Sequence, residues 1–300
     1  MSRLHWLMAL AAVLLVNCLL VPSRAIGQLP GDGRLVDVGG YRLHITCAGV
    51  GSPTVVLEAG LGGSSNGWVK VMPEVATFTR VCAYDRPNEG ASDAAPRRII
   101  QAGAGPFIAL RNGHDVINDL HTLLFKAGEV GPYVLVGHSL GGLYSILYAN
   151  AYPKEVVGMV LEDSVHPDQL IMRAKIGGPV FARREHESLM QNEEGADIDA
   201  ILAEGKAIHW HTGMPLYVLC AAPGTFPTNN TDGLTEEQWD RLQKVHREWE
   251  EDLARLSSDS KFVVAEKSGH FIHRDQPDIV IDAIRSVVGE ARARPAESPR

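Results

Sequence analysis

The segment from residue 133 to residue 152 constrains the fold more than any other part of the chain. A short apolar run, Tyr-Val-Leu-Val, stops at Gly137-His138-Ser139-Leu140-Gly141, and a helix-like segment follows without a spacer. A strand, a sharp turn and a helix in this order form the context in which a G-x-S-x-G sequence exposes its serine as a nucleophile. Glycine suits both flanks of such a turn, because a Cβ atom there would collide with neighbouring backbone. Ser139 is therefore the candidate nucleophile.

The same pattern occurs a second time at residues 63–67, where it centres on Ser65. This copy lies several residues beyond the strand predicted before it and is followed by Trp-Val-Lys, which indicates a loop. A G-x-S-x-G pentapeptide is weak evidence alone, so the surrounding pattern decides between the two copies. That pattern favours Ser139.

The composition predicts one ordinary globular domain with a small insertion, because the chain has 300 residues, of which 45% are hydrophobic and 21% are charged. A net charge of −8 argues against nucleic acid as a partner, since nucleic-acid binding needs clustered Lys and Arg. The chain contains neither an HExxH nor a CxxC sequence, and its 12 histidines are scattered. The sequence therefore predicts no metal and no cofactor.

Residues 1–25 are typical of a secretory signal peptide. Arg3 supplies a short basic region, residues 4–21 are almost wholly apolar, and Ser23 and Ala25 are small residues before a cleavage site after Ala25. The apolar stretch also just reaches membrane-spanning length, so an uncleaved signal anchor is the alternative. We expect the protein to be secreted or periplasmic, without membrane contact once the signal is removed.

Strand-like and helix-like segments alternate beyond this signal. A hairpin with Gly39-Gly40 at its turn is predicted over residues 35–47. Strand-like runs cover residues 54–58, 80–84, 133–136, 156–161, 216–220 and 262–266, and helix-like segments cover residues 69–76, 114–126, 143–152, 235–256 and 277–288. A hairpin followed by this alternation predicts a mostly parallel, doubly wound α/β sheet of about eight strands.

Residues 168–213 interrupt the alternation, because they contain many helix formers and no strand-like run, with Gly177-Gly178-Pro179 as an internal break. We interpret them as a small helical cap inserted into the sheet domain. The core then consists of residues 26–167 and 214–290. The Pro-, Arg- and Glu-rich residues 291–300 are predicted to be a disordered tail.

The candidate functional residues follow the predicted strands. They are Gly60, Asp85, Ser139, Asp163 and His270. Because ligands of parallel sheets bind beyond the carboxyl ends of the strands, we expect these residues to meet at one edge of the sheet.

Four motifs in this order resemble those of the α/β-hydrolase-fold serine hydrolases, an esterase- and lipase-like family. Residues 59–62, Ala-Gly-Leu-Gly, stand where the family has a His-Gly-x-Gly oxyanion loop, and residues 85–92 are similar to its Asp-Arg-x-Gly-x-Gly-x-Ser. The elbow and the Ser-Gly-His at 268–270 complete a likeness that covers about residues 34–290. Ala59 and Asn88 depart from the family pattern, but neither position carries a group that performs chemistry.

The resemblance implies a triad of serine, histidine and carboxylate. A neutral serine hydroxyl needs an adjacent base, and the family carries that base after the last strand, where His270 stands. His273, one helical turn further on, is the rival base. His138 lies beside Ser139 in sequence but points away from the nucleophile in such an elbow, so we interpret it as a packing or supporting residue.

A carboxylate must orient the imidazole and stabilise its charged form. The family's commonest position for this acid follows the strand at residues 216–220, where this chain has Ala-Ala-Pro-Gly-Thr. Some members place the acid after the strand that follows the elbow, and Asp163 stands there. Asp163 is therefore the expected acid, with Asp232 and Glu162 as alternatives.

Two backbone N–H groups must bind the oxyanion that forms in acyl transfer. By position in the family pattern, these groups belong to Leu140, which follows the nucleophile, and to Leu61 in the glycine loop. We interpret Asp85 and Arg86 as a structural buttress beneath the site rather than as a catalytic pair.

The cysteines predict one disulfide. Cys18 leaves with the signal peptide, so Cys47, Cys82 and Cys220 remain, and an odd number in an oxidising compartment indicates one bridge and one buried thiol. The resemblance places the second strand antiparallel to the strand that carries Cys82, which would bring Cys47 opposite Cys82. Two buried thiols are the alternative.

These features lead us to expect a secreted serine hydrolase that cleaves a carboxylic ester, or a related acyl bond, of a small-molecule substrate through an acyl-enzyme. Aminopeptidase, lactonase or C–C hydrolase activity on the same triad is the alternative, because the cap sets substrate choice in this family and its sequence is uninformative. A non-catalytic binding protein on a hydrolase scaffold is a further alternative. Neither the substrate nor the oligomeric state follows from the sequence.

Overall fold

The structure, a computed structural model, describes residues 28–96, 98–102, 105–208, 212–224 and 233–294. The predicted signal peptide, Asp232 and residues 295–300 of the predicted tail lie outside these ranges. No helix in the described part of the chain combines the length and the hydropathy needed to cross a membrane.

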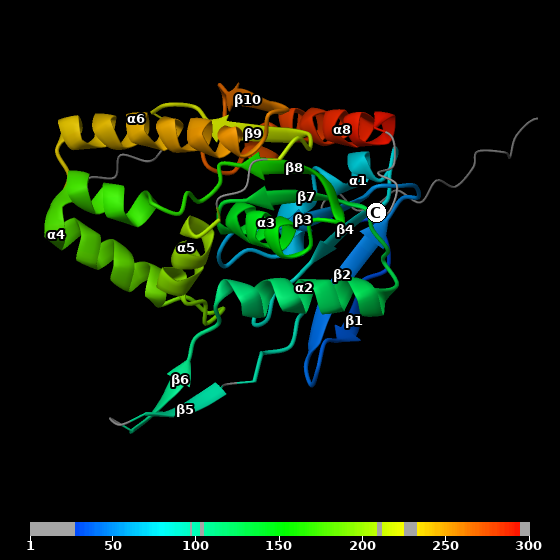
Figure 1. Ribbon diagram of the computed structural model, residues 1–300, viewed down its shortest axis with the longest axis horizontal. Helices are drawn as coiled ribbons and strands as arrows, with labels where there is room; N and C mark the ends of the chain where they lie inside the picture. The colour runs from blue at the N-terminus through cyan, green and yellow to red at the C-terminus, as the bar shows by residue number, and fades with distance from the viewer. Residues whose placement is uncertain (1–27, 97, 103–104, 209–211, 225–232, 295–300) are drawn as a thin grey trace, which may run out of the picture.

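An eight-stranded sheet runs through the middle of the molecule (Figure 1). Its strands are β1 (Arg34–Asp37), β2 (Arg42–Ala48), β3 (Thr54–Glu58), β4 (Val81–Tyr84), β7 (Tyr133–His138), β8 (Val156–Glu162), β9 (Leu216–Ala221) and β10 (Ser260–Ala265). They lie in the order β1-β2-β4-β3-β7-β8-β9-β10. β2 pairs antiparallel with both β1 and β4, whereas all other neighbours are parallel. The predicted α/β sheet is confirmed.

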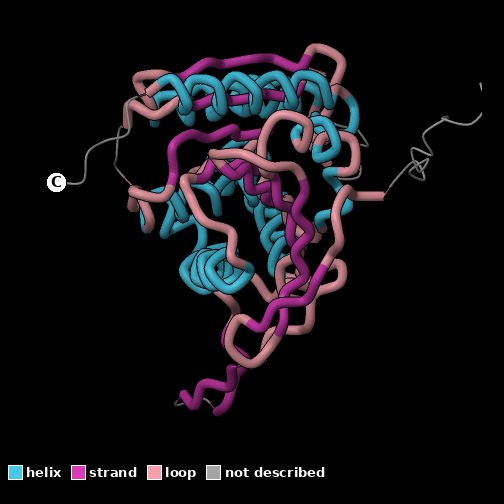
Figure 2. The backbone as a smooth tube through the Cα atoms, turned by 90° about the vertical axis from the view of Figure 1, so that its right-hand side faces the viewer, coloured by secondary structure: helices cyan, strands magenta, loops and turns pink. Residues whose placement is uncertain are grey.

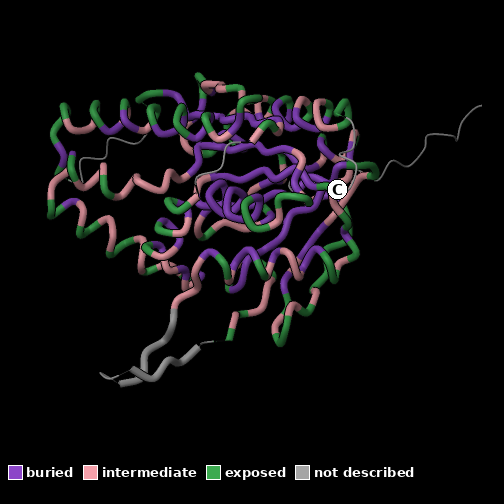
Figure 3. The backbone as a smooth tube through the Cα atoms, in the orientation of Figure 1, coloured by how far each residue is buried: buried purple, intermediate pink, exposed green. Residues whose placement is uncertain are grey.

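Helices pack on both faces of this sheet. Four of them contact its strands directly or through a neighbouring helix: α2 (Gly113–Ala127), α3 (Leu140–Ala151), α6 (Glu236–Leu253) and α8 (Pro277–Ala293). Along β7, Leu135 belongs to the apolar cluster shared with α2 and α3, whereas Val134 and Val136 belong to the cluster shared with α8. A strand buried on both faces carries a continuous apolar run, which explains the sequence of β7. Figure 3 shows the buried residues gathered in the sheet and along α3.

The described part of the insertion between β8 and β9 contains two helices, α4 (Gln169–Met190) and α5 (Ile198–Lys206). Gly178 interrupts α4 with φ 81° and ψ 176°, a conformation available to glycine, and Pro179 follows it. α4 packs against α6, where Trp249 is buried. Figure 1 shows α4 and α5 beside the sheet, near the end of the molecule where α6 begins.

Three local expectations need correction. The segment predicted as one helix at residues 69–76 consists of a short 3₁₀ turn, η1 (Ser65–Trp68), and the single-turn helix α1 (Met72–Val75). An antiparallel pair that the sequence did not predict, β5 (Arg98–Ala102) and β6 (Gly105–Ala109), projects from the molecule (Figures 1 and 2).

The third correction concerns the tail, which is helical rather than disordered at residues 291–293, because α8 continues to Ala293. Alanine and arginine are good helix formers, and Arg292 donates hydrogen bonds to the carbonyl oxygens of Ser52 and Phe78 at 2.7 and 3.0 Å. These contacts hold the last turn against the sheet domain.

The predicted disulfide is present. Cys47 in β2 lies opposite Cys82 in β4 in the antiparallel ladder, and the two sulfur atoms are bonded. Cys220 in β9 is a free, buried thiol. The bridge therefore joins β2, at the antiparallel edge of the sheet, to β4, which pairs in parallel with β3.

Candidate active site

Ser139 lies at the sharp turn between β7 and α3. Its backbone has φ 53° and ψ −123°, a positive φ that a non-glycine residue keeps only where the surrounding structure imposes it. A Cβ atom at Gly137 would lie 2.4 Å from the carbonyl oxygen of Gly141, and one at Gly141 would lie 2.5 Å from the carbonyl oxygen of Glu58. Close backbone packing therefore requires both glycines of the pentapeptide.

The second copy of the pattern has a different environment. Ser65 is buried in η1, and its backbone N–H donates to Oδ1 of Asp85 at 2.6 Å. Asp85 also accepts a hydrogen bond from the backbone N–H of Ala91 at 2.9 Å and pairs with Nδ1 of His44 at 3.0 Å. This carboxylate holds two loops together, as expected for a buttress.

His270 and Asp163 form a hydrogen-bonded pair at the carboxyl edge of the sheet. Nδ1 of His270 lies 2.6 Å from Oδ2 of Asp163. Asp163 directly follows β8, is buried, and has φ 43°, whereas His270 follows β10 with a side chain that is 33% exposed. A buried carboxylate on an accessible imidazole is the arrangement that orients a general base and stabilises its cation.

The second oxygen of Asp163 is also occupied. Oδ1 lies 2.8 Å from Nε2 of His246 and accepts a hydrogen bond from the backbone N–H of Ala221 at 2.9 Å. Burial alone would raise the pKa of Asp163, but the hydrogen bonds from His246 and His270 outweigh it and hold the pKa of this carboxyl well below its usual range. Asp163 is therefore ionised. Sequence reasoning missed His246, which reaches the site from α6.

His138 supports the loop that carries His270. Its Nε2 lies 2.8 Å from the carbonyl oxygen of His270, and the two imidazole rings are 4.5 Å apart. Burial lowers the pKa of His138 from 6.5 to about 4, so its ring is neutral near pH 7 and donates from Nε2 to that carbonyl. This contact brings the residue beside Ser139 against the candidate base, in agreement with the supporting role expected from the sequence.

The two rival residues pair with each other. Oε1 of Glu162 lies 2.6 Å from Nδ1 of His273 and accepts a hydrogen bond from the backbone N–H of His273 at 2.8 Å. Both side chains are buried. Burial would raise the pKa of Glu162, but the charge and hydrogen bonds of His273 lower it overall. This pair fixes the turn at α7 (Ile272–Asp275). Glu162 directly precedes Asp163 in the chain, and His273 follows His270 by three positions.

Three clusters in the described residues bring His, Cys or carboxylate atoms within 4.8 Å of one another. One contains the disulfide, whose sulfurs are already bonded. In the second, a Cβ atom at Gly60 would lie 2.8 Å from Nδ1 of His138, and one at Gly67 would lie 3.5 Å from Nε2 of His273. Nδ1 of His138 and Nε2 of His273 therefore face different glycines and do not converge on one point.

The third cluster combines Asp163 and His246 with Cys220. Burial raises the pKa of the Cys220 thiol, which donates a hydrogen bond to the carbonyl oxygen of Ala221 at 3.3 Å. None of the three clusters in this part of the chain presents a set of convergent, unoccupied ligand atoms.

The glycine loop after β3 lies beside the nucleophile. A Cβ atom at Gly60 would lie 3.1 Å from Cβ of Ser139. Leu140 is the first residue of α3, where a backbone N–H has no acceptor within the helix. Among the described residues, neither the N–H of Leu140 nor that of Leu61 donates a hydrogen bond. Their role as oxyanion donors stays a prediction.

Arg86 clamps this loop from below. Its guanidinium donates to the carbonyl oxygens of Ala59 and Gly60 at 2.6 and 2.5 Å and to Oε1 of Glu58 at 2.5 Å. Arg86 is only 2% exposed. Burial would lower its pKa, but the charges of Glu194 and Glu58 raise it well above the ordinary value, so the guanidinium is charged.

Glu194, from the loop between α4 and α5, completes the clamp. Its two oxygens accept hydrogen bonds from Nη2 and Nε of Arg86 at 2.6 and 2.8 Å, and Oε1 also accepts the backbone N–H of Gly62 at 2.7 Å. A bidentate pair of this kind fixes geometry as well as charge. Sequence reasoning anticipated the structural role of Arg86 but missed Glu194, because nothing in the cap sequence indicates a contact 108 positions away.

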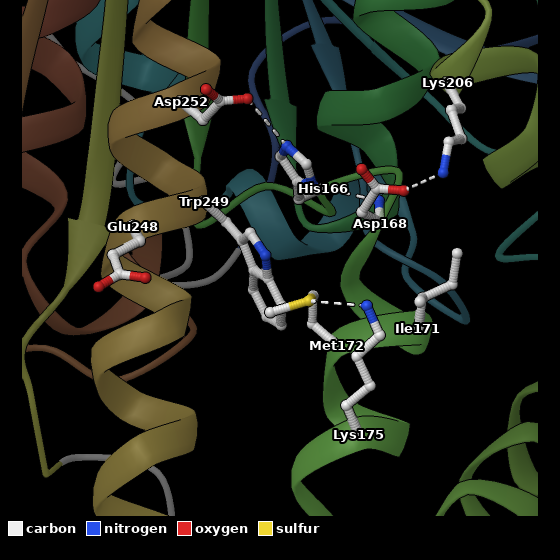
Figure 4. Close-up of a pocket in the computed structure, with 9 residues that line it drawn as sticks. All are labelled: His166, Asp168, Ile171, Met172, Lys175, Lys206, Glu248, Trp249 and Asp252. Atoms are coloured by element: carbon white, nitrogen blue, oxygen red, sulfur yellow. Dashed lines mark hydrogen bonds and ion pairs between the residues drawn. The ribbon is translucent and has the colours of Figure 1, made fainter.

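A cavity of about 390 Å³ lies between α4 and α6 (Figure 4). It is lined by His166, Asp168, Ile171, Met172, Lys175, Lys206, Glu248, Trp249 and Asp252. Lys206 pairs with Asp168 at 2.6 Å and His166 pairs with Asp252 at 3.3 Å. Neither Ser139 nor His270 lines this cavity, so it does not itself place a ligand against the nucleophile.

Known proteins resemble this chain in sequence and in fold. The profile of the alpha/beta hydrolase family matches residues 55–283. The uncharacterized protein YqjL of Bacillus subtilis (strain 168) is 30% identical over 236 residues, which cover 78% of this chain and 83% of YqjL.

Two solved structures share the fold. A thermophilic esterase from Thermogutta terrifontis has a TM-score of 0.56 and 19% identity, covering 87% of this chain and 99% of its own. An esterase from Exiguobacterium antarcticum has a TM-score of 0.57 and 16% identity, covering 86% and 100%. At these identities the structures show the fold alone, whereas the family profile spans most of the chain and its described site. The chain belongs to the alpha/beta hydrolase family, and it is a hydrolase.

Proposed function

We propose that this hydrolase is a secreted serine hydrolase that cleaves a carboxylic ester, or a related acyl bond, of a small-molecule substrate through an acyl-enzyme. One observation supports this best: Ser139 stands at a positive-φ turn, and the hydrogen-bonded His270–Asp163 pair stands at the same edge of the sheet. Such an arrangement supplies a nucleophile, a base and a group that orients the base.

In the proposed reaction, Oγ of Ser139 attacks the substrate carbonyl while His270 accepts its proton. Because Nδ1 of His270 faces Asp163, Nε2 is the nitrogen that takes this proton and returns it to the leaving group. Water then attacks the acyl-enzyme, with His270 again as the base. The N–H groups of Leu61 and Leu140 bind the tetrahedral oxyanion, and losing one such donor typically costs about 3 kcal/mol of transition-state stabilisation.

Export from the cytoplasm is part of the proposal. Residues 1–25 have the sequence of a signal peptide, and the Cys47–Cys82 bridge is of a kind that persists in oxidising compartments. N-terminal sequencing of the exported protein tests this point: we expect Ile26 as the first residue, and recovery of the intact N-terminus in the membrane fraction would indicate a signal anchor instead.

A fluorophosphonate probe tests the nucleophile, because it labels an activated serine covalently. We expect the wild-type protein to label and Ser139→Ala to lose both labelling and esterase activity. Ser65→Ala alters the second G-x-S-x-G copy and should keep both. An unlabelled wild-type protein, or equal labelling of Ser139→Ala, would contradict a serine nucleophile at this position.

A substrate panel tests the bond that is cleaved. p-Nitrophenyl esters of graded acyl length are compared with aminoacyl p-nitroanilides and with lactones, all at matched concentrations. We expect the highest kcat/KM for an ester. A higher value for an aminoacyl anilide or a lactone would replace the ester assignment while leaving the serine mechanism intact.

A further inference from the structure

Asp163 is hydrogen-bonded to two imidazoles at once. Its Oδ2 lies 2.6 Å from Nδ1 of His270, and its Oδ1 lies 2.8 Å from Nε2 of His246. The Asp163 side chain is fully buried, whereas those of His246 and His270 are 17% and 33% exposed. The proposed triad uses only one of these imidazoles, so the second needs a role.

A well-packed helix delivers His246 to this position. α6 begins with a capping box at Thr235, and its residues Val245 and Trp249 are buried against α4. The rings of His246 and Trp249 meet edge-on with centroids 6.4 Å apart. Because its neighbours in the helix are packed, the His246 imidazole is directed at Asp163 by a rigid element rather than by a loop.

The other titratable groups around the pair come from four elements, and His138 of β7 is one of them, with its ring centroid 4.5 Å from that of His270. Glu250, one helical turn beyond His246, is fully buried, and burial and then the charge of Asp163 raise its pKa well above the ordinary value. Burial raises the pKa of Cys220 in β9 in the same way. Glu162 in β8 is engaged with His273.

Charged groups further along α6 are paired away from the site. Arg247 forms an ion pair with Glu251 at 3.0 Å, and His166, whose ring stacks on Trp249, pairs with Asp252. Asp163 is therefore the carboxylate that His246 and His270 share.

We propose that His246 is a positioning residue of this active site: it holds Oδ1 of Asp163 so that Oδ2 stays directed at His270, and it competes with His270 for the charge of that carboxylate. The proposal rests on the serine hydrolase function proposed above. Rotation of the Asp163 carboxylate would break the hydrogen bonds from both His246 and the Ala221 N–H, and it would leave the buried Ala221 N–H unsatisfied.

The competition between the two imidazoles should change how kcat/KM depends on pH. Two imidazoles on one carboxylate titrate as a coupled pair, because a proton on one disfavours a proton on the other. Replacing His246 with a residue that donates a hydrogen bond but does not titrate should move the acid limb of the kcat/KM profile to higher pH, by about one unit.

Steady-state kinetics on folded variants test the positioning role. His246→Phe removes the donor while keeping a ring, and we expect kcat to fall about tenfold with KM within about twofold, the pattern of an interaction that matters in the transition state. His246→Gln restores a donor and should recover most of kcat at pH 8 while shifting the acid limb. Lys244→Gln, an exposed change on the same helix, is the control and should match the wild-type protein.

Either of two results would overturn the proposal. One is a His246→Phe variant with wild-type kcat and a wild-type pH profile. The other is a raised KM with unchanged kcat, which would place His246 against the substrate instead. Far-ultraviolet circular dichroism and thermal melting establish that each variant is folded before its kinetics are compared.

Histidine titration by NMR provides a readout that does not depend on activity. In the apo protein, replacing either histidine with Gln should change the titration curve of the other, because two imidazoles on one carboxylate are coupled sites. Unmoved midpoints would contradict the shared carboxylate. Failure of fluorophosphonate labelling in the wild-type protein would instead refute the hydrolase mechanism and leave this coupling measurable.

Discussion

At the scale of single residues, two neighbouring carboxylates at the end of β8 hold two histidines that lie three positions apart. Glu162 holds His273 in the interior, and Asp163 holds His270 at the accessible edge. The positive φ of Asp163, 43°, turns its side chain out of the strand alternation toward β9 and α6. The pairs have the same chemistry, so accessibility is what distinguishes the candidate base from the structural histidine.

Substitution of each carboxylate should separate these roles. Asp163→Asn should lower kcat by about four orders of magnitude, because an amide favours the wrong tautomer of the base. Glu162→Gln should retain most of kcat but lose about 1–3 kcal/mol of stability, because it weakens a fully buried pair. Kinetics and urea denaturation of the two variants provide the comparison, and a reversed pattern would assign the acid to Glu162.

The buried imidazole of His138 should make stability depend on pH. Its pKa is about 4 in the folded protein, against 6.5 for an ordinary histidine. As the pH falls below 6.5, His138 therefore becomes protonated in the unfolded chain but stays neutral in the folded protein, which favours unfolding. This residue alone should lower the free energy of unfolding by about 2 kcal/mol between pH 7 and pH 5.

The matched variant is His138→Gln, which keeps a donor for the His270 carbonyl and does not titrate. Urea denaturation at pH 7 and pH 5 should show a smaller loss of stability for the variant than for the wild-type protein. Equal losses in both proteins would mean that the His138 ring is charged in the folded state.

The sequence predicts the residues whose signal is local and fails for those whose partners are distant. Ser139 and His270 stand in short motifs, and Asp163 directly follows a recognisable strand, so all three could be nominated. His246 and Glu194 lie in helical or loop segments without a motif, and their partners are 83 and 108 positions away. Only the packing of α6 and of the cap against the sheet brings them to the site.

At the scale of elements, the cap takes part in building the glycine loop. Glu194 contributes a carboxylate that Arg86 and the Gly62 N–H share, so the insertion fixes the loop that contains Leu61. Both charged side chains are almost fully buried. The loop conformation therefore depends on a segment that lies in the insertion rather than in the sheet domain.

Glu194→Gln should weaken this clamp. The amide keeps one acceptor oxygen but loses the negative charge that balances the buried guanidinium, so we expect a loss of about 3 kcal/mol of stability. We also expect a lower kcat with little change in KM, because the oxyanion donors act in the transition state. The neighbouring exposed Glu193 provides the control variant, Glu193→Gln. A raised KM with full kcat would place Glu194 at the substrate instead.

The elements also show where periodicity misleads. The β5–β6 pair was not predicted, because Pro106 and the glycines around it are unfavourable in strands. The end of α8 was predicted too early, because a Pro-, Arg- and Glu-rich composition resembles a disordered tail. The hydrogen bonds of Arg292 to the carbonyl oxygens of Ser52 and Phe78, more than 200 positions away, stabilise the last turn of α8.

At the scale of the whole molecule, the order of the strands explains why the motifs converge. β7, β8, β9 and β10 are parallel neighbours, so Ser139, Asp163, Ala221 and His270 all follow strands that end at one edge. α6 contacts this edge through His246, and the cap contacts the neighbouring glycine loop through Glu194. The mostly parallel sheet was predicted from the sequence, whereas the contacts of α6 and the cap with this edge were not.

The Cys47–Cys82 bridge acts at this same scale, because it ties β2 to β4 across 35 positions of sequence. In the chain-entropy view, closing a loop of that length stabilises the folded state by about 4 kcal/mol. The double variant Cys47→Ala/Cys82→Ala should therefore lose about that much free energy of unfolding while the folded fraction keeps its kcat, since neither cysteine belongs to the candidate active site.

Urea denaturation and thiol titration of the chain that begins at Ile26 test this prediction together. The native protein should show no reactive thiol, because Cys220 is buried with a raised pKa, and the denatured protein should show one. Cys220→Ala is the control, which should show no thiol in either state and keep the bridge. Three thiols in the denatured, unreduced wild-type protein would show that Cys47 and Cys82 are free, and the stability of the antiparallel edge would then come from its packing alone.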